Sequence, residues 1–100
     1  MVGDHATYHR QYDAPLNSDI PTIVGPNSLW VKSADRADDV AALAAEAVAA
    51  SFGPPGGPVS LILPADSAWT ETKAGAVKAK TPERPAPSGE AVEAAARAIR

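Results

Sequence analysis

The chain has 100 residues, a mass of 10.2 kDa, a net charge of −3 and no cysteine. This length allows one small domain, and its core is expected to be marginal because 22 of the 45 hydrophobic residues are alanine. The absence of cysteine excludes disulfides and thiolate metal sites, and the negative charge argues against nucleic acid as a partner. Residues 1–10 contain no apolar leader, and no run approaches the ~20 apolar residues of a membrane span. We therefore expect a cytoplasmic protein without membrane contact.

The N-terminal part predicts the end of a strand followed by a long loop. Residues 1–4 are typical of a strand end, and residues 5–19 are polar without an apolar period. Asp13 is expected to cap a short helical turn over residues 15–22. The sequence GPN at residues 25–27 predicts a break after this turn.

A strand, a helix and a second strand are predicted next. Residues 29–32 (LWVK) are rich in aromatic and β-branched side chains, as strands are. The apolar period over residues 40–51 predicts a helix, and acidic residues gather where its N-terminus would favour them: Asp35, Asp38 and Asp39. Residues 59–63 (VSLIL) form a near-continuous apolar run, typical of a parallel strand covered on both faces. The expected fold class is α/β, with a partial parallel sheet built on a βαβ unit.

The composition changes in the last third of the chain. Residues 1–70 carry a net charge of −5, whereas residues 71–100 carry +2 and include three closely spaced prolines, Pro82, Pro85 and Pro87. Residues 67–88 have no apolar period, which predicts a linker. Ser88 is expected to cap a last helix, whose apolar stripe is Val92, Ala95, Ala96 and Ile99. This pattern predicts a compact unit, then a linker, and then the start of another unit.

The individual residues do not reveal a mechanism. His5 and His9 have the spacing of two metal ligands on one helix face, but no third ligand is evident and they lie in a predicted loop. A nucleophile triad could be assembled from Ser18, His9 and Asp13, but the sequence lacks the nucleophile elbow that such a site needs. Asp66 follows a predicted parallel strand at the end where α/β proteins bind ligands, although helix capping or solvation explains a single carboxylate better.

Two blocks of sequence carry a more specific signal. The first comprises residues 2–9 (VGDHATYH), 12–16 (YDAPL) and 18–20 (SDI), and the second is residues 57–66 (GPVSLILPAD). Together they resemble the thiamine-diphosphate-dependent enzymes of the acetolactate-synthase-like group. The likeness implies that residues 1–69 form the C-terminal half of the pyrimidine-binding domain, residues 70–87 a linker, and residues 88–100 the first helix of the following central domain.

The resemblance implies a parallel α/β sheet and, in the full-length enzyme, carboligation or decarboxylation of a 2-keto acid with thiamine diphosphate and Mg²⁺. It also implies a homo-oligomer whose active site lies at a subunit interface. The family's activating glutamate and its diphosphate-binding domain have no counterpart here, since Glu46 lies in the Ala-rich helix. No catalytic, metal-binding or cofactor-binding residue is therefore assigned, and no cofactor is expected for this chain alone. The residues that the resemblance places at the lining of the substrate pocket are His5, Thr7 and His9.

Asp13 and Asp19 also match the family's pattern, and capping of the short helix is the role expected for them. The leading interpretation is a fragment of an acetolactate-synthase-like enzyme that is inactive alone. The alternative is a small non-enzymatic interaction module that pairs an exposed strand edge with a full-length relative or another partner. A small metal-binding protein that uses His5 and His9 is the third interpretation.

Overall fold

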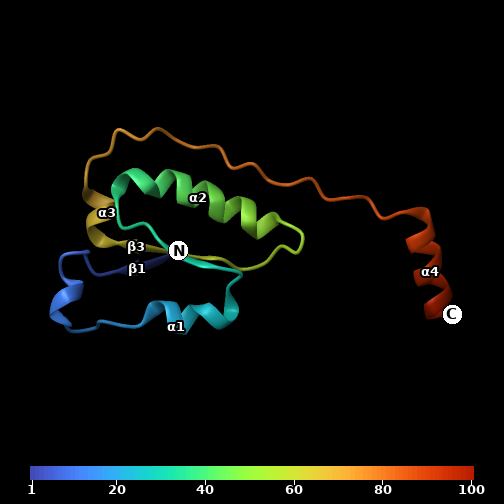
Figure 1. Cartoon of the computed structure of the whole chain (residues 1–100), viewed down its shortest axis with the longest axis horizontal. Helices are drawn as coiled ribbons and strands as arrows, with labels where there is room; N and C mark the ends of the chain where they lie inside the picture. The colour runs from blue at the N-terminus through green and yellow to red at the C-terminus, as the bar shows by residue number, and fades with distance from the viewer.

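The sheet of this protein has three short parallel strands. The computed structural model describes residues 1–100, and its strands are β1 (Val2–Asp4), β2 (Val31–Ser33) and β3 (Ser60–Pro64), in the order β1-β3-β2. Helix α2 (Ala37–Phe52) lies on one side of the sheet and α1 (Ile20–Val24) on the other (Figure 1). The predicted α/β class with a partial parallel sheet is confirmed.

Strand β3 lies at the centre because it is the most apolar of the three. It is hydrogen-bonded to a parallel neighbour on each edge. Leu61 and Ile62 are only 3% and 4% exposed, whereas every residue of β2 is half-buried. The buried set of the whole chain has six members: Ala6, Ala34, Leu61, Ile62, Pro64 and Ser67. Such a small core agrees with the high alanine content of the sequence.

The predicted Ala-rich helix is confirmed as α2, which packs against β3 and the short helix α3 (Ala65–Trp69). Asp38 and Asp39 occupy its first turn, where the partial positive charge of the helix end favours carboxylates. The glycine-rich segment after it forms a tight turn. A Cβ on Gly56 would lie 2.6 Å from the backbone oxygen of Ser51, so only glycine fits there without a shift of the backbone.

The prediction that Asp13 caps a short helix is wrong. Asp13 instead follows a 3₁₀ turn, η1 (Arg10–Tyr12), and has the left-handed φ of 46° that ends such a turn. Helix α1 begins at Ile20 and is capped by Asp19, whose carboxylate accepts hydrogen bonds from the Thr22 amide at 3.3 Å and the Thr22 hydroxyl at 2.6 Å. The start of the helix is set by Pro21, which fits the first helical turn because that turn needs no N–H from it. The capping role expected for Asp19 is confirmed.

Strand β2 begins two residues later than predicted. The amide of Leu29 donates to the Pro58 oxygen at 2.7 Å, and the Trp30 oxygen accepts from the Ser60 amide at 3.1 Å. These bonds hold residues 29 and 30 beside the chain that enters β3, but the regular parallel ladder starts only at Val31. The aromatic and β-branched pattern therefore identified the strand and misplaced its boundary.

The linker prediction is wrong for residues 67–69, which belong to helix α3 (Ala65–Trp69). This helix follows β3 directly and has five residues, too few to show an apolar period. Ser67 is buried and its hydroxyl donates to the backbone oxygen of Ala34 at 2.6 Å. That hydrogen bond joins α3 to the residue that follows β2.

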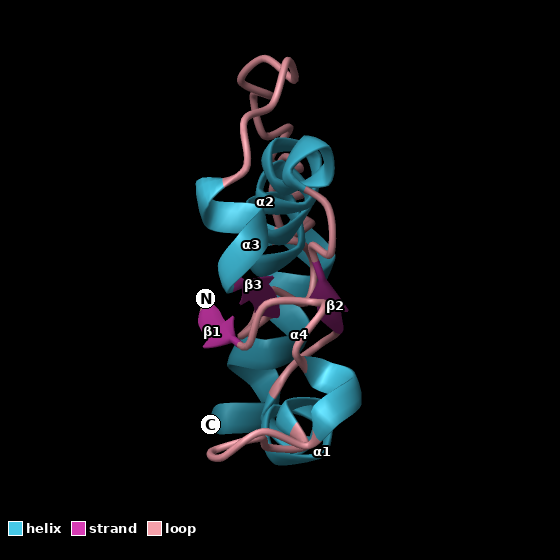
Figure 2. Cartoon of the chain, turned by 90° about the vertical axis from the view of Figure 1, so that its left-hand side faces the viewer, coloured by secondary structure: helices cyan, strands magenta, loops and turns pink.

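Residues 70–88 contain no helix or strand, and they lead to α4 (Gly89–Ile99). The N-cap predicted at Ser88 is confirmed, since its hydroxyl accepts a hydrogen bond from the Ala91 amide at 3.1 Å. Helix α4 lies away from the sheet at the end of this segment (Figure 1), so it falls behind the main body in the end-on view of Figure 2. Its apolar stripe is exposed, with Ile99 at 86%. No helix of the chain is both long and apolar enough for a membrane span.

Candidate functional site

Polar side chains gather at the edge of the sheet where all three strands end. Because the strands are parallel, the ends of β1 at Asp4, β2 at Ser33 and β3 at Pro64 lie at one edge. Asp35 follows β2 and Asp66 follows β3 by two residues each. This edge is the place where open α/β sheets bind ligands, so it is the candidate functional site.

Arg10 links the ends of β1 and β2. Its Nε and Nη2 atoms both lie 3.0 Å from Oδ2 of Asp4, and its Nη1 lies 3.0 Å from Oδ1 of Asp35. The Nη2 atom also donates to the Ser33 hydroxyl at 3.2 Å, and that hydroxyl donates to Asp35 at 2.5 Å. One guanidinium thus contacts two carboxylates and one hydroxyl from two strands. Asp4 is the most enclosed of the three charged side chains, at 13% exposed against 32% for Arg10 and 54% for Asp35.

A second link joins the same loop to the end of β3. The Thr7 amide donates to Oδ1 of Asp66 at 2.9 Å, and the Thr7 hydroxyl donates to Oδ2 at 2.5 Å. These residues are 59 positions apart, so the contact is a long-range tie that only the folded sheet creates. The prediction that Asp66 caps a helix or faces solvent missed this partner.

Hydrogen bonds keep two of these carboxylates ionised. The hydrogen bond from the Ser33 hydroxyl is the main cause that lowers the pKa of Asp35 below its ordinary value of 3.8. Partial burial opposes it, and the hydrogen bond and charge of Arg10 add to the lowering. The hydroxyl and amide of Thr7 likewise lower the pKa of Asp66. Both groups are therefore anionic at neutral pH. Neither is poised to act as a general acid or base.

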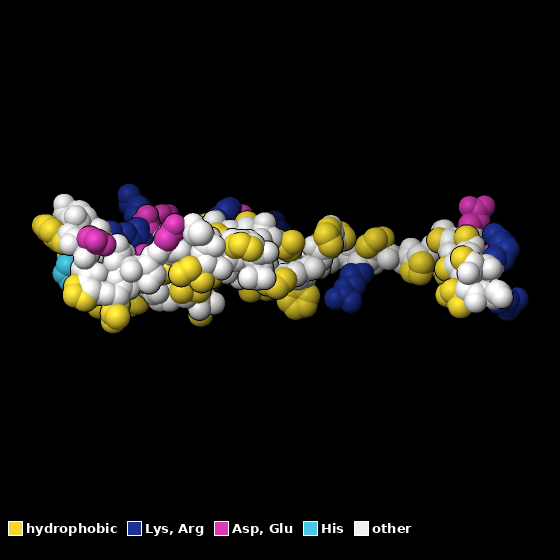
Figure 3. All heavy atoms as spheres, turned by 90° about the horizontal axis from the view of Figure 1, so that it is seen from below, with side chains coloured by type: hydrophobic (Ala, Val, Ile, Leu, Met, Phe, Trp, Pro, Cys, Tyr) yellow, Lys and Arg dark blue, Asp and Glu magenta, His cyan; other side chains and the backbone are white.

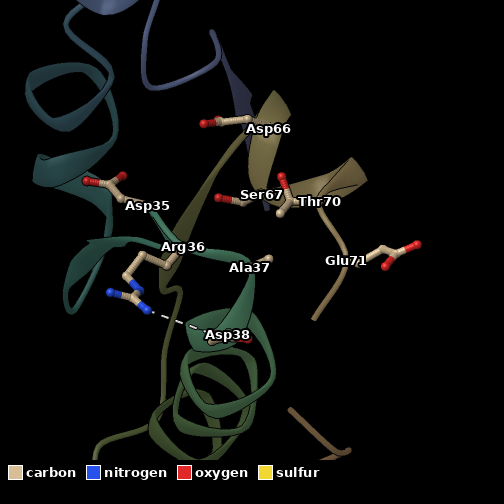
Figure 4. Close-up of a pocket in the computed structure, with 8 residues that line it drawn as sticks. All are labelled: Asp35, Arg36, Ala37, Asp38, Asp66, Ser67, Thr70 and Glu71. Carbon is tan, nitrogen blue, oxygen red and sulfur yellow. Dashed lines mark ion pairs between the residues drawn. The ribbon is translucent and has the colours of Figure 1, made fainter. Parts of the chain in front are cut away.

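An open pocket of about 280 Å³ lies next to this cluster, at the start of α2 and along α3. Figure 4 shows Asp35 and Asp66 on its rim, while Glu71 points away from the other residues. Arg36 reaches the Asp38 carboxylate at 3.7 Å. The pocket is strongly polar, but no three His, Cys, Asp or Glu side chains of the chain are placed to hold a metal ion.

The three residues predicted to line a substrate pocket do not converge on one cavity. His5 lines a separate, largely apolar pocket of about 340 Å³ together with Leu16, Ile20 and Ile23. Thr7 is engaged by Asp66, as described above. His9 is exposed and packs edge-on against the Tyr8 ring, with 4.4 Å between the ring centroids.

The hypothetical triad does not assemble either. The Ser18 hydroxyl donates to the backbone oxygen of Leu16 at 3.3 Å, and the Asp13 carboxylate accepts from the side-chain amide of Asn17 at 2.9 Å. His9 contacts Tyr8 as described, so the three groups have separate partners. Each of these contacts joins residues at most four positions apart, so each of the three side chains stabilises its own part of the loop.

The residue that sequence reasoning missed is Arg10. It lies in a polar loop, and no motif marks it. The only available signal is its distance from the strand: a cation six residues after Asp4 can fold back onto the carboxylate that ends the strand. Recognising that contact requires knowing that Asp35 from β2 arrives at the same edge.

Comparisons with known proteins add an independent observation. No family model matches the chain, and no solved structure matches it. The chain is 51% identical over 72 residues to a Mycobacterium tuberculosis protein named "Putative acetolactate synthase large subunit IlvX". The match supports the acetolactate-synthase-like family. It covers 71% of the chain but only 14% of that relative's length.

Proposed function

We propose that this chain is a fragment of a thiamine-diphosphate-dependent, acetolactate-synthase-like enzyme, and that it forms the C-terminal half of the pyrimidine-binding domain. The observation that carries the proposal is the 51% identity over 72 residues to a protein named as an acetolactate synthase large subunit. The parallel α/β sheet with a polar cluster at the ligand-binding edge supports it. The full-length protein would carry out carboligation or decarboxylation of a 2-keto acid as a cytoplasmic homo-oligomer.

In that enzyme, the role of this chain is to build one wall of the active site. The loop of residues 5–13 stands at the ligand-binding edge and carries His5, Thr7 and His9. His5 is the best placed of these to face a substrate, because it lines the apolar pocket beside β1. The pocket combines apolar side chains with His5, Ser18 and Asp4, and the charge of Asp4 is paired with Arg10. Its apolar part suits the alkyl group of a small 2-keto acid, and the His5 imidazole offers a donor for the carboxylate.

The residues of this chain do not by themselves fit thiamine diphosphate. The cofactor's diphosphate calls for cations or a metal ion, but Arg10 is already occupied by Asp4 and Asp35. Glu46 is on the exposed face of α2, where it pairs with Lys32, so it is not an activating glutamate at the ligand edge. The remaining cofactor-binding groups would come from other parts of the full-length protein. We therefore expect the chain alone to be inactive.

A second candidate function is an interaction module without enzymatic activity. Strand β1 has a neighbour on one edge only, which leaves its other edge available for pairing. Several large apolar side chains are also exposed, among them Leu16 at 93% and Trp69 at 65%. Figure 3 shows hydrophobic side chains on the surface of both the main body and α4.

Thermal unfolding with and without thiamine diphosphate and Mg²⁺ tests the first proposal. The 100-residue chain should show no rise in Tm and no consumption of pyruvate. The native-size polypeptide, captured from its own cells with an antibody against this chain, should show a rise in Tm and should consume pyruvate. A rise in Tm for the isolated chain would contradict the stated division of the cofactor site. A native-size protein without either response would contradict the enzyme assignment and favour the interaction module.

A further inference from the structure

We propose that Arg10 is a positioning residue, whose guanidinium fastens the loop of residues 5–13 to the ends of β1 and β2 and so fixes the rim of the site before any ligand binds. The inference rests on the proposed function only in taking this loop as the border of a substrate pocket. The fastening itself follows from the contacts within the chain.

Four of the five N–H groups of the guanidinium are directed at protein acceptors, and one on Nη1 has no protein partner. Each of its three nitrogens donates to a protein group, and its single positive charge lies between the two carboxylates of Asp4 and Asp35. An anion that needs a bidentate contact with Arg10 would have to displace one of these carboxylates. Displacing Asp4 would leave a carboxylate that is 13% exposed without its cation, which is unfavourable. Arg10 is therefore built to hold protein groups in place.

The loop is held at two points that are three residues apart. Thr7 ties it to Asp66 beyond β3, and Arg10 ties it to β1 and β2, so all three strands contribute. Between the ties, the His9 amide donates to the oxygen of Ala6 at 2.8 Å, and Ala6 is buried. This arrangement leaves few alternative conformations for Tyr8 and His9.

The geometry of arginine matters here. Its planar fork reaches Asp4 and Asp35 in two directions at once, whereas a lysine ammonium is a single point of charge on a flexible stem. Lysine at this position should hold Asp4, the more enclosed partner, and lose Asp35. A neutral glutamine should lose both ion pairs. The number of ion pairs at position 10 therefore falls from arginine to lysine to glutamine.

Amide hydrogen exchange of the full 100-residue chain at neutral pH tests the proposal. In Arg10→Gln, the loop amides of Thr7, His9 and Tyr12 should exchange at least about tenfold faster than in the wild type, because charged hydrogen bonds are lost. Arg10→Lys should give an intermediate rate. The amides of α2 should keep their rates in both variants. The matched control is Lys32→Gln, which removes the ion pair with Glu46 and should leave the loop rates unchanged.

A second variant and an anion titration complete the test of Arg10. If Arg10→Gln unfolds the whole chain, Asp35→Asn replaces it, since this variant keeps the enclosed Asp4 pair and should still speed loop exchange without affecting α2. Titration of the wild type with pyruvate or inorganic pyrophosphate should leave the NMR resonance of the Arg10 Nε–H unchanged.

The proposal is overturned if the wild-type loop exchanges as fast as residues 70–87, or if Arg10→Lys and Asp35→Asn both leave the loop at the wild-type rate. It is also overturned if either anion shifts the Arg10 resonance, because Arg10 would then be a ligand-binding residue. None of these readouts depends on the cofactor, so their failure would leave the family assignment untouched.

Discussion

Replacing Ile62 with alanine should remove a large part of the chain's stability. Ile62 is 4% exposed and lies on the central strand, paired in register with Val2 on one side and Ser33 on the other. Truncation of a buried isoleucine to alanine costs about 2–5 kcal/mol through lost burial and the cavity left behind. Domains of this length have a free energy of unfolding of ~5–15 kcal/mol, and a core of six residues places this chain at the lower end. The loss should therefore be about half of the total or more.

Urea unfolding measures this effect, with tryptophan fluorescence as the signal, which reports Trp30 just before β2 and the more exposed Trp69. The matched control is Ile99→Ala, which makes the same chemical change at a side chain that is 86% exposed on α4. The control should change the free energy of unfolding by no more than about 0.5 kcal/mol. If Ile62→Ala shifts the urea midpoint no further than Ile99→Ala does, β3 is not the core of the fold and the reasoning fails.

Four further results are expected. Acidification from about pH 5 to pH 2 should destabilise the chain, as followed by circular dichroism. The cause is that folding lowers the pKa of Asp35 and of Asp66 below 3.8. The stability that each carboxylate contributes is complete above that value and is lost as the pH falls through the lowered pKa. A flat profile over this range would contradict the two hydrogen-bonded carboxylates. Thr7→Val should speed amide exchange in residues 5–13 while α2 keeps its rates; unchanged loop rates would show that the Asp66 tie is dispensable. Ser67→Ala should cost about 1 kcal/mol in urea unfolding, because the oxygen of Ala34 loses a buried donor; no loss would contradict that contact. Ser88→Ala should lower the helicity of α4 alone, by about 1 kcal/mol of capping, as read from NMR chemical shifts.

Long periodic segments explain what the sequence predicted well. The Ala-rich helix spans more than four turns and the run at residues 59–63 is almost wholly apolar, so α2 and β3 stood out from their patterns. The cap at Ser88 follows from a local hydrogen bond between residues three apart. Such features depend on neighbours along the chain, which the sequence shows directly.

The features that were missed depend on neighbours in space or on competition between local signals. Helix α3 is too short for a period, and Asp13 looked like a cap because nothing in the sequence shows that η1 ends there. The site has the same limitation. Arg10 gains its role only because β1 and β2 bring Asp4 and Asp35 to one edge, and His5 is separated from Thr7 and His9 by the course of the loop.

The mass of the native polypeptide in its own cell, measured by immunoblot and intact mass spectrometry, decides whether this chain is part of a larger enzyme. We expect a product several times larger than 10.2 kDa, because the chain spans only 14% of the relative it matches. A folded native product of 10.2 kDa would contradict the fragment assignment. The likeness to acetolactate synthase would then describe ancestry, and the function would lie in an interaction with a partner.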